Sequence, residues 1–516
     1  MQVYVLALAL AALLAPGCTA ASSATSTRRL LQAPASAAAA AAPALEPTNN
    51  AASWCCQQLA AIGFSSNLPV VVLDTMGAPL EVKGVDALSR LCTCSPGLPA
   101  PDYDGLSEAA VHGSTSATAQ KKSFKLQLRQ AAGFNDTKKQ DWALLGMPAD
   151  ADWVLYGGDE VDLTLGMRNY LGYDLARASG QYAARTVWCE LFLMDDGAAE
   201  LDPSHYHGIY IAMEQPKTAK QRVDVAKLEP PNLSGGYLFT YDNDNTEAGD
   251  VLFGPLSGWD HPFQMKDPKK APPEALTWLT SYLQSFQDAL EAPDWLRQAS
   301  CRSPSYTSFI NGPSWLDYFL ITELTKNPDG YRGSVYLHKD RDLPMAAGPI
   351  WDLNEAFGQC CGYPIEGWQQ QGVSGPGVAG GSAISTDGWR FLICADVDRC
   401  KIDPTDGLSR WYRRMWEDDR FKTGASTRWA QLRAGPWSDT AVEAIISSVS
   451  AQIKPAVLRS YDRWASVILK PWFPNSEVQW TTEVSNLKDW TLQHMAWMDG
   501  AFAQAGASVP PAAGRR

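Results

Sequence analysis

The stretch that decides the fold is Lys326–Gly358, which reads "KNPDGYRGSVYLHKDRDLPMAAGPIWDLNEAFG". It sets Asp329 in a Gly-flanked turn and Asp352 just past an apolar run. Between them, two segments of strand character meet at a turn over residues 339–342, which predicts a β-hairpin. A hairpin returns its ends to one edge, so both carboxylates can face one cleft. Because an isolated buried carboxylate is costly, two that converge are expected to share a cation or to divide a reaction.

A predicted helix leads directly to Asp329. Residues 312–327, "GPSWLDYFLITELTKN", carry apolar residues at helical spacing, with Ser314 as the expected N-cap and a stop enforced by Pro328. Further helical segments follow between residues 408 and 467. Their Trp and Leu stripes are interpreted as core, because such stripes are more often core than a ligand site.

One lysine upstream is a candidate for phosphate binding. Residues 121–130, "KKSFKLQLRQ", alternate with period two, which places Lys122 on the apolar face of a predicted strand. The plain interpretation is a lysine at the first residue of the strand that extends outward to solvent. The functional interpretation is an inward ammonium held for a phosphate.

Two further side chains belong to predicted elements between these regions. The apolar runs 186–194 and 206–215 predict an antiparallel pair of strands, and Glu214 lies at the end of the second strand. A glutamate at a strand end is usually solvated, but one that meets Lys122 would form a candidate site. Residues 162–180 predict a helix that carries Arg168 near its start.

Length, composition and net charge limit the classes to which the protein can belong. At 516 residues the chain exceeds one ordinary hydrophobic core, so a two-lobed unit or two domains are expected. The composition, 45% hydrophobic and 19% charged, is typical of a globular protein. A net charge of -13 argues against a nucleic-acid surface and against a polybasic membrane tether.

The N-terminus predicts a secreted protein. Its short apolar core and the small residues after it are typical of a signal peptide, although a lipoprotein leader is an alternative for "LAPGC". No later segment reaches the ~20 apolar residues that a bilayer needs, so no membrane span is expected. The predicted organisation is a signal peptide at 1–20, a disordered Ala- and Pro-rich linker at 21–50, a Cys-bearing segment at 51–101, a main domain at 102–475, and a C-terminal helix with a disordered tail at 476–516.

Eleven cysteines are present, and loss of the signal peptide with Cys18 leaves ten. In an oxidising compartment these are expected to form disulfides, and "WCC" at Trp54 with "CTC" at Cys92 could be one clasp. Zinc is the alternative, but no pair shows zinc-ligand spacing with histidines behind it. Asn135-Asp136-Thr137 and Asn232-Leu233-Ser234 are glycosylation sequons.

A series of motifs in order, over roughly 350 residues, resembles the CotH kinase family of secreted or spore-coat atypical protein kinases. "HGSTSATAQKKSFKLQL" resembles the family's opening block, with His112 where arginine is usual. "LLGMPADADWVLYGGDEVDLTLGMRNYLGYDLAR" and "HGIYIAMEQ" with "SGGYLF" resemble two further blocks. "DYFLITELTKNPDGYRGSVYLHKDRD" and "GPIWDLNEAFG" resemble its most diagnostic segment.

The resemblance implies an α+β fold of the atypical protein-kinase type, with a β-rich N-lobe and a helical C-lobe over residues 102–475. It implies ATP with Mg²⁺ or Mn²⁺ as cofactors, and Ser or Thr of a secretory or extracellular protein as the phosphate acceptor. Carried over by position, Asp329 is the expected catalytic base and Asp352 the expected metal ligand.

By the same resemblance, Lys122 and Glu214 are expected to hold the nucleotide as a pair, with Lys121 as a substitute for Lys122. Arg168 is expected to bind a phosphate or to tie the lobes together; an ordinary surface ion pair is the alternative. Asp162 belongs to the same block, and its plain role is a helix N-cap.

Two departures bear on the metal. Ser334 stands five residues after Asp329, where a typical kinase catalytic loop has asparagine, and is a weaker ligand. Asn354 stands where many members have a second aspartate; its amide oxygen can still coordinate Mg²⁺, but one negative charge is lost. The alternative function is therefore a catalytically weak surface or coat binding protein. From composition alone, a secreted glycoside hydrolase would explain the carboxylates and twenty tryptophans equally well.

Overall fold

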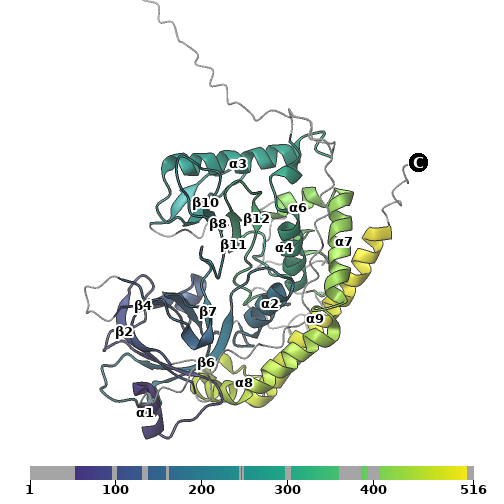
Figure 1. Ribbon diagram of the computed structural model, residues 1–516. Coiled ribbons are helices and arrows are strands. Elements are labelled where there is room, and N and C mark those ends of the chain that lie inside the picture. Colours follow the sequence, from purple (N-terminus) through teal and green to yellow (C-terminus); the bar gives the residue numbers. More distant parts are fainter. Residues whose placement is uncertain are drawn as a thin grey trace, which may run out of the picture.

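The computed structural model describes residues 53–95, 102–130, 138–158, 162–242, 246, 249–296, 304–359, 385–392 and 407–507. Within these ranges the chain forms eight α-helices and two β-sheets, which confirms the expected α+β class. Figure 1 shows a barrel at the lower left, the second sheet above it, and long C-terminal helices along the right side. The predicted signal peptide and linker lie outside the described residues.

The N-terminal half is a closed seven-stranded barrel in the order β1-β2-β3-β4-β5-β7-β6. Neighbouring strands are antiparallel except β1 and β6, which are parallel. The predicted alternation in β4 is confirmed, because Phe124, Leu126 and Leu128 are buried in the core while Lys125 is exposed. The strands are β1 Val70–Asp74, β2 Ala87–Cys94, β3 Asp104–His112, β4 Ser123–Arg129, β5 Asp152–Tyr156, β6 Thr186–Met194 and β7 Tyr206–Glu214.

Two disulfides fasten the first helix to the barrel. Helix α1, Trp54–Ala61, carries Cys55 and Cys56, which are bonded to Cys92 and Cys94 of β2. The predicted clasp is therefore confirmed. Because β1 and β2 are barrel strands, the Cys-bearing segment shares one barrel with β3 to β7.

Cys189 departs from the disulfide prediction. It is a free thiol, fully buried in β6 within the barrel core. Burial raises the pKa of this thiol to about 12, so the group stays protonated and unreactive. Cys301, Cys360, Cys361, Cys394 and Cys400 lie outside the described residues.

The second sheet has five strands in the order β12-β11-β8-β10-β9. The predicted hairpin is confirmed, since β11 and β12 pair antiparallel with Leu337 opposite Ala347. Its second strand is shorter than expected, because Gly348 takes a φ of 105° and Pro349 has no N–H to donate. The strands are β8 Tyr237–Tyr241, β9 Val251–Phe253, β10 Phe263–Asp267, β11 Val335–Lys339 and β12 Ala346–Ala347.

Helix α4, Gly312–Thr325, is the centre of the helical half. Ten of its 14 residues are buried, since other elements pack around it. Its N-cap is Asn311 rather than Ser314: the Asn311 side chain accepts the N–H of Ser314 at 3.2 Å, because Gly312 and Pro313 already form the first turn. The other helices are α2 Met167–Ala178, α3 Pro273–Glu291, α6 Ser409–Met415, α7 Asp419–Arg433, α8 Asp439–Ile468 and α9 Ser476–Ala507.

Helix α8 is the one segment of the described ranges with the length and composition of a membrane span. It packs against β7 and α9 (Figure 1) and buries Ile446, Ile453 and Val457. Pro455 lies within it, and the backbone leaves helical geometry at Trp464. A core helix passes the same composition test, so α8 is weak evidence for a span.

Candidate active site

Asp329 lies just beyond the C-terminal end of α4. The helix ends because Lys326 adopts a left-handed conformation, with a φ of 47°, two residues before Pro328. The Asp329 carbonyl accepts the N–H groups of Arg332 and Gly333 at 2.9 and 2.8 Å, which closes a tight turn. The Asp329 side chain is exposed. The turn therefore presents this carboxylate to solvent on a constrained backbone.

Asp352 is exposed in the segment that follows β12 and has a φ of 59°. A non-glycine residue in this region is strained, and such strain persists where the surroundings hold the backbone. Here the Asp352 N–H donates to the Tyr173 hydroxyl at 3.2 Å, and the N–H of Leu353 donates to Asn169 Oδ1 at 2.8 Å. The Tyr173 ring also stacks on Trp351, with 5.9 Å between ring centroids. Helix α2 thus holds the chain on both sides of Asp352.

Asn327 joins the two loops. Its Oδ1 accepts the N–H of Asp329 at 3.2 Å, and its Nδ2 donates to the carbonyl of Asp352 at 3.0 Å. One nearly buried amide group is therefore within hydrogen-bond distance of the backbones of both aspartates. Asn327 thus links the backbone of the Asp329 turn to that of the Asp352 segment.

The residues expected to assist the metal lie in the same neighbourhood. Ser334, with a φ of 51°, donates its N–H to the carboxylate of Asp242 at 2.7 Å. Asp242 directly follows β8 and was not anticipated from the sequence. Burial raises the pKa of Tyr336, and the charges of Asp242 and Asp352 raise it further. Asn354 is half-buried in the turn after Asp352.

Lys122 and Glu214 do not form the expected pair. Lys122 precedes β4, and its Nζ donates to two carbonyl oxygens of the preceding turn at 3.2 and 3.0 Å. Strand register explains the separation: Glu214 of β7 is opposite Trp153 of β5, which is opposite Leu126 of β4. Lys122 is four residues before Leu126, a separation of about 13 Å along a strand.

Lys121 cannot replace Lys122 in this role. Its side chain is 1% exposed, and its Nζ donates to the carbonyls of Gly157 and Ile209 and lies 4.7 Å from the centre of the Tyr210 ring. Ile209 lies five residues before Glu214 in β7, a distance of about 17 Å. Lys121 therefore stabilises the other end of the barrel.

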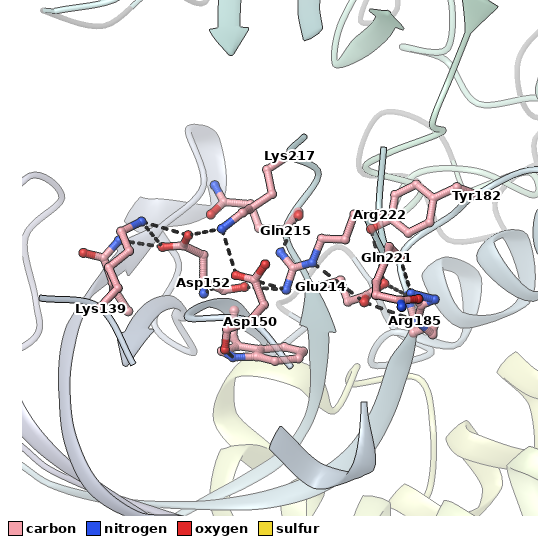
Figure 2. Close-up of polar contacts among 12 residues, drawn as sticks. Lys139, Asp150, Asp152, Tyr182, Arg185, Glu214, Gln215, Lys217, Gln221 and Arg222 are labelled. Carbon is pink, nitrogen blue, oxygen red and sulfur yellow. Dashed lines mark hydrogen bonds and ion pairs between the residues drawn. The ribbon is translucent and has the colours of Figure 1, made fainter. Parts of the chain in front are cut away.

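Glu214 is fully buried at the end of β7, and arginine and tyrosine side chains contact it. Arg185 donates to it twice, from Nε at 3.2 Å and from the backbone N–H at 3.0 Å. The Tyr182 hydroxyl donates at 3.2 Å, and Arg222 Nε lies 3.7 Å from the carboxylate. Figure 2 shows the three side chains converging on Glu214. These contacts offset the cost of burying a carboxylate.

Arg168 has no exposed surface, so in this structure it cannot contact a phosphate. Its Nη1 donates to the Thr164 hydroxyl at 2.8 Å and lies 3.4 Å from Asp162. Burial lowers the pKa of Arg168, and the charges of Asp162 and Glu483 oppose that shift. The Arg168–Asp162 ion pair is fully buried, so it is not the ordinary surface ion pair that was the alternative.

A buried polar network supports the Asp329 loop from behind. The Arg390 guanidinium donates to the carbonyls of Asn327 and Pro328. Glu323 of α4 accepts the Tyr331 hydroxyl at 2.6 Å and the N–H of Phe391 at 3.1 Å. Burial raises the pKa of Glu323 to about 7. The only sequence signal for this network was a glutamate inside the apolar run "YFLITELTKN".

The comparisons agree with the motif resemblance. A family model described as CotH kinase protein matches residues 109–498, which covers both exposed aspartates, the barrel from β4 onward and most of α9. No curated protein sequence matches the chain. The match spans about three quarters of the sequence, and the chain therefore belongs to the CotH kinase family.

Proposed function

We propose that the chain is an ATP-dependent protein kinase that transfers the γ-phosphate to Ser or Thr hydroxyls of secretory-pathway or extracellular proteins. The barrel serves as the β-rich N-lobe and the helical half as the C-lobe of a kinase-like fold. One observation carries the proposal: Asn327 joins the backbones that present Asp329 and Asp352. Phosphoryl transfer needs such positioned carboxylates more than it needs covalent chemistry.

Asp352 and three neighbouring residues carry oxygen atoms of the kind that a divalent cation prefers. Asp352 and Asp242 offer carboxylates, Asn354 an amide oxygen and Ser334 a hydroxyl, and Mg²⁺ prefers such hard ligands. These residues would hold Mg²⁺ or Mn²⁺, and the bound metal would neutralise charge on the phosphates. Asp329 would orient the acceptor hydroxyl and accept its proton.

The disulfides support a location outside the cytosol. Cys55–Cys92 and Cys56–Cys94 form in oxidising compartments and rarely persist where thiols are kept reduced. With the predicted signal peptide, they favour substrates in the secretory route or beyond it.

A catalytically weak surface or coat binding protein is the second candidate. The observation that favours it is Asn354, which supplies no negative charge where many family members have aspartate. The retained pair of exposed aspartates favours the kinase. Family membership argues against the glycoside hydrolase that composition alone allowed.

Transfer of labelled phosphate from ATP, with Mg²⁺ or Mn²⁺, tests the proposal. The acceptors are the protein itself and casein. Asp329→Asn removes the base and Asp352→Ala a metal ligand, and each is expected to lower transfer by about 100-fold or more. Asp288→Asn, an exposed change on α3, is the control and should leave transfer unchanged. Wild-type labelling that survives both changes would refute the kinase assignment. Mg·ATP binding without transfer would favour the binding protein.

A further inference from the structure

The buried carboxylate Glu214 has a cation beside it that reaches solvent. The Arg185 side chain is 31% exposed, whereas Arg222, the other arginine near Glu214, is 1% exposed. Arg185 uses Nε for Glu214 and Nη2 for the carbonyl of Gln221, so its position is defined on two sides. The exposed part of the guanidinium keeps donor capacity for a ligand, because the group carries five N–H donors.

The row of ion pairs that includes Glu214 contains one more cation than carboxylates. Along the row in Figure 2, Lys217 lies 2.9 Å from Asp150 and 2.7 Å from Asp152, and Lys139 lies 2.9 Å from Asp152. Together with the pairs at Glu214, the row contains four cations and three carboxylates. The cations are Lys139, Arg185, Lys217 and Arg222, and the carboxylates are Asp150, Asp152 and Glu214. A local excess of positive charge in a chain of net charge -13 suits an anionic ligand.

Aromatic residues connect this row to the Asp352 segment. The Tyr182 hydroxyl donates to Glu214, and its ring lies 5.8 Å from the Arg185 guanidinium carbon. Tyr182 and Trp351 pack against the same small apolar cluster of Val223, Leu238 and Tyr336. Trp351 immediately precedes Asp352 in the chain. Through Tyr182, packing therefore connects Arg185 to the segment that carries Asp352.

We propose that Arg185, supported by Glu214 and Tyr182, is the residue that holds the phosphates of the nucleotide, in the role expected of Lys122. The proposal rests on the kinase function proposed above. A guanidinium can bind two phosphate oxygens at once, and a buried carboxylate behind it keeps its orientation defined. The role is one of binding: it raises affinity for the triphosphate and contributes no contact to the nucleoside.

Calorimetric titration with Mg·ATP and with adenosine tests this assignment without a measurement of activity. Arg185→Gln is expected to weaken Mg·ATP binding by about ten-fold or more and to leave adenosine binding unchanged. Arg185→Lys, which keeps a cation for Glu214, should give intermediate affinity. Arg90→Gln is the matched control, because Arg90 is a barrel arginine paired with Asp104 and is similarly exposed, at 35%. Melting temperatures identify any variant that does not fold. If Arg185→Gln does not fold, the Mg·ATP affinity of Arg185→Lys tests the assignment.

The outcomes separate the two proposals. An unchanged Mg·ATP affinity in both Arg185 variants overturns this inference and leaves the kinase function standing. Lys122→Gln tests the rival assignment, in which Lys122 holds the phosphates. If Lys122→Gln loses Mg·ATP binding and the Arg185 variants keep it, the inference is also overturned. A wild-type protein that binds no Mg·ATP overturns both proposals.

Discussion

At the scale of single residues, Asn327 connects the loop of Asp329 to the loop of Asp352. Its amide oxygen accepts from the Asp329 loop, and its amide nitrogen donates to the Asp352 loop. Aspartate at this position would keep the acceptor for the Asp329 N–H but would set a carboxylate oxygen against the Asp352 carbonyl. The substitution therefore separates the two loops, while the side chains of Asp329 and Asp352, the proposed base and metal ligand, stay in the protein.

Asn327→Asp is expected to lower kcat for phosphate transfer by about ten- to 100-fold, because the relative position of Asp329 and Asp352 is lost. The affinity for adenosine should stay within about two-fold, since Asn327 bonds the backbones of the Asp329 and Asp352 loops, whose proposed roles concern the phosphates. Steady-state kinetics together with calorimetry check this separation. Asn311→Ala removes the N-cap at the other end of α4, and it should cost about 1 kcal/mol of stability without a change in kcat. Equal kcat values for Asn327→Asp and wild type would contradict the positioning role.

The two aspartates could be predicted from the sequence, because local features place them. A helix stop and a hairpin lie within the same 33-residue stretch, Lys326–Gly358, and require no knowledge of distant strands. The cation for Glu214 could not be predicted in this way. It depends on the pairing of β6 with β7, which sets Arg185 beside Glu214, and on the register of β4, β5 and β7, which keeps Lys122 away. Period-two alternation reports which face a residue occupies but not its height along the strand.

At the scale of elements, the clasp between α1 and β2 contains two disulfides that close nearly the same loop. Cys55–Cys92 spans 37 residues and Cys56–Cys94 spans 38. A crosslink stabilises a protein largely by restricting the unfolded chain. The second crosslink of one loop restricts that chain little further, so the two contributions should not add.

Replacing one pair of cysteines by alanine is therefore expected to cost roughly 1 kcal/mol, whereas replacing both pairs should cost roughly 3–4 kcal/mol. Chemical denaturation monitored by tryptophan fluorescence measures both values. Cys189→Ala is the control for loss of a buried sulfur without loss of a crosslink. Equal and additive losses for the two pairs would show that each disulfide acts through local contacts instead.

Element types were predicted more accurately than their limits. The helix before Asp329, the hairpin and the strand at residues 121–130 all form, but the N-cap shifts to Asn311 and β12 stops at Ala347. Both differences arise at Gly-Pro steps, where glycine conformation and the missing N–H of proline change the boundary. The closure of the barrel was not predictable, because it depends on the parallel pairing of β1 with β6, which are more than 100 residues apart.

At the scale of the whole molecule, helix α8 joins the barrel to the helical half. It packs on β7 and on α9, and Arg459 extends from it to Glu190, a fully buried carboxylate in β6. The contact is bidentate, with distances of 2.9 and 2.6 Å, and the Tyr206 hydroxyl is the other partner of Glu190 at 2.6 Å. Because a buried charge left without its partner is costly, this ion pair couples the stability of the two halves.

Arg459→Leu is expected to destabilise the protein by about 3 kcal/mol, since Glu190 would remain buried with only a phenol to compensate its charge. Glu190→Gln combined with Arg459→Leu should recover at least half of that loss, because an amide needs no counter-ion. Lys454→Leu is the matched control on the same helix: its pair with Glu477 is exposed on both sides, so its loss should cost less than about 1 kcal/mol. Urea unfolding of the four proteins measures these free energies. If Arg459→Leu and Lys454→Leu unfold alike, the buried pair does not couple the barrel to the helices, and apolar packing of α8 alone accounts for their association.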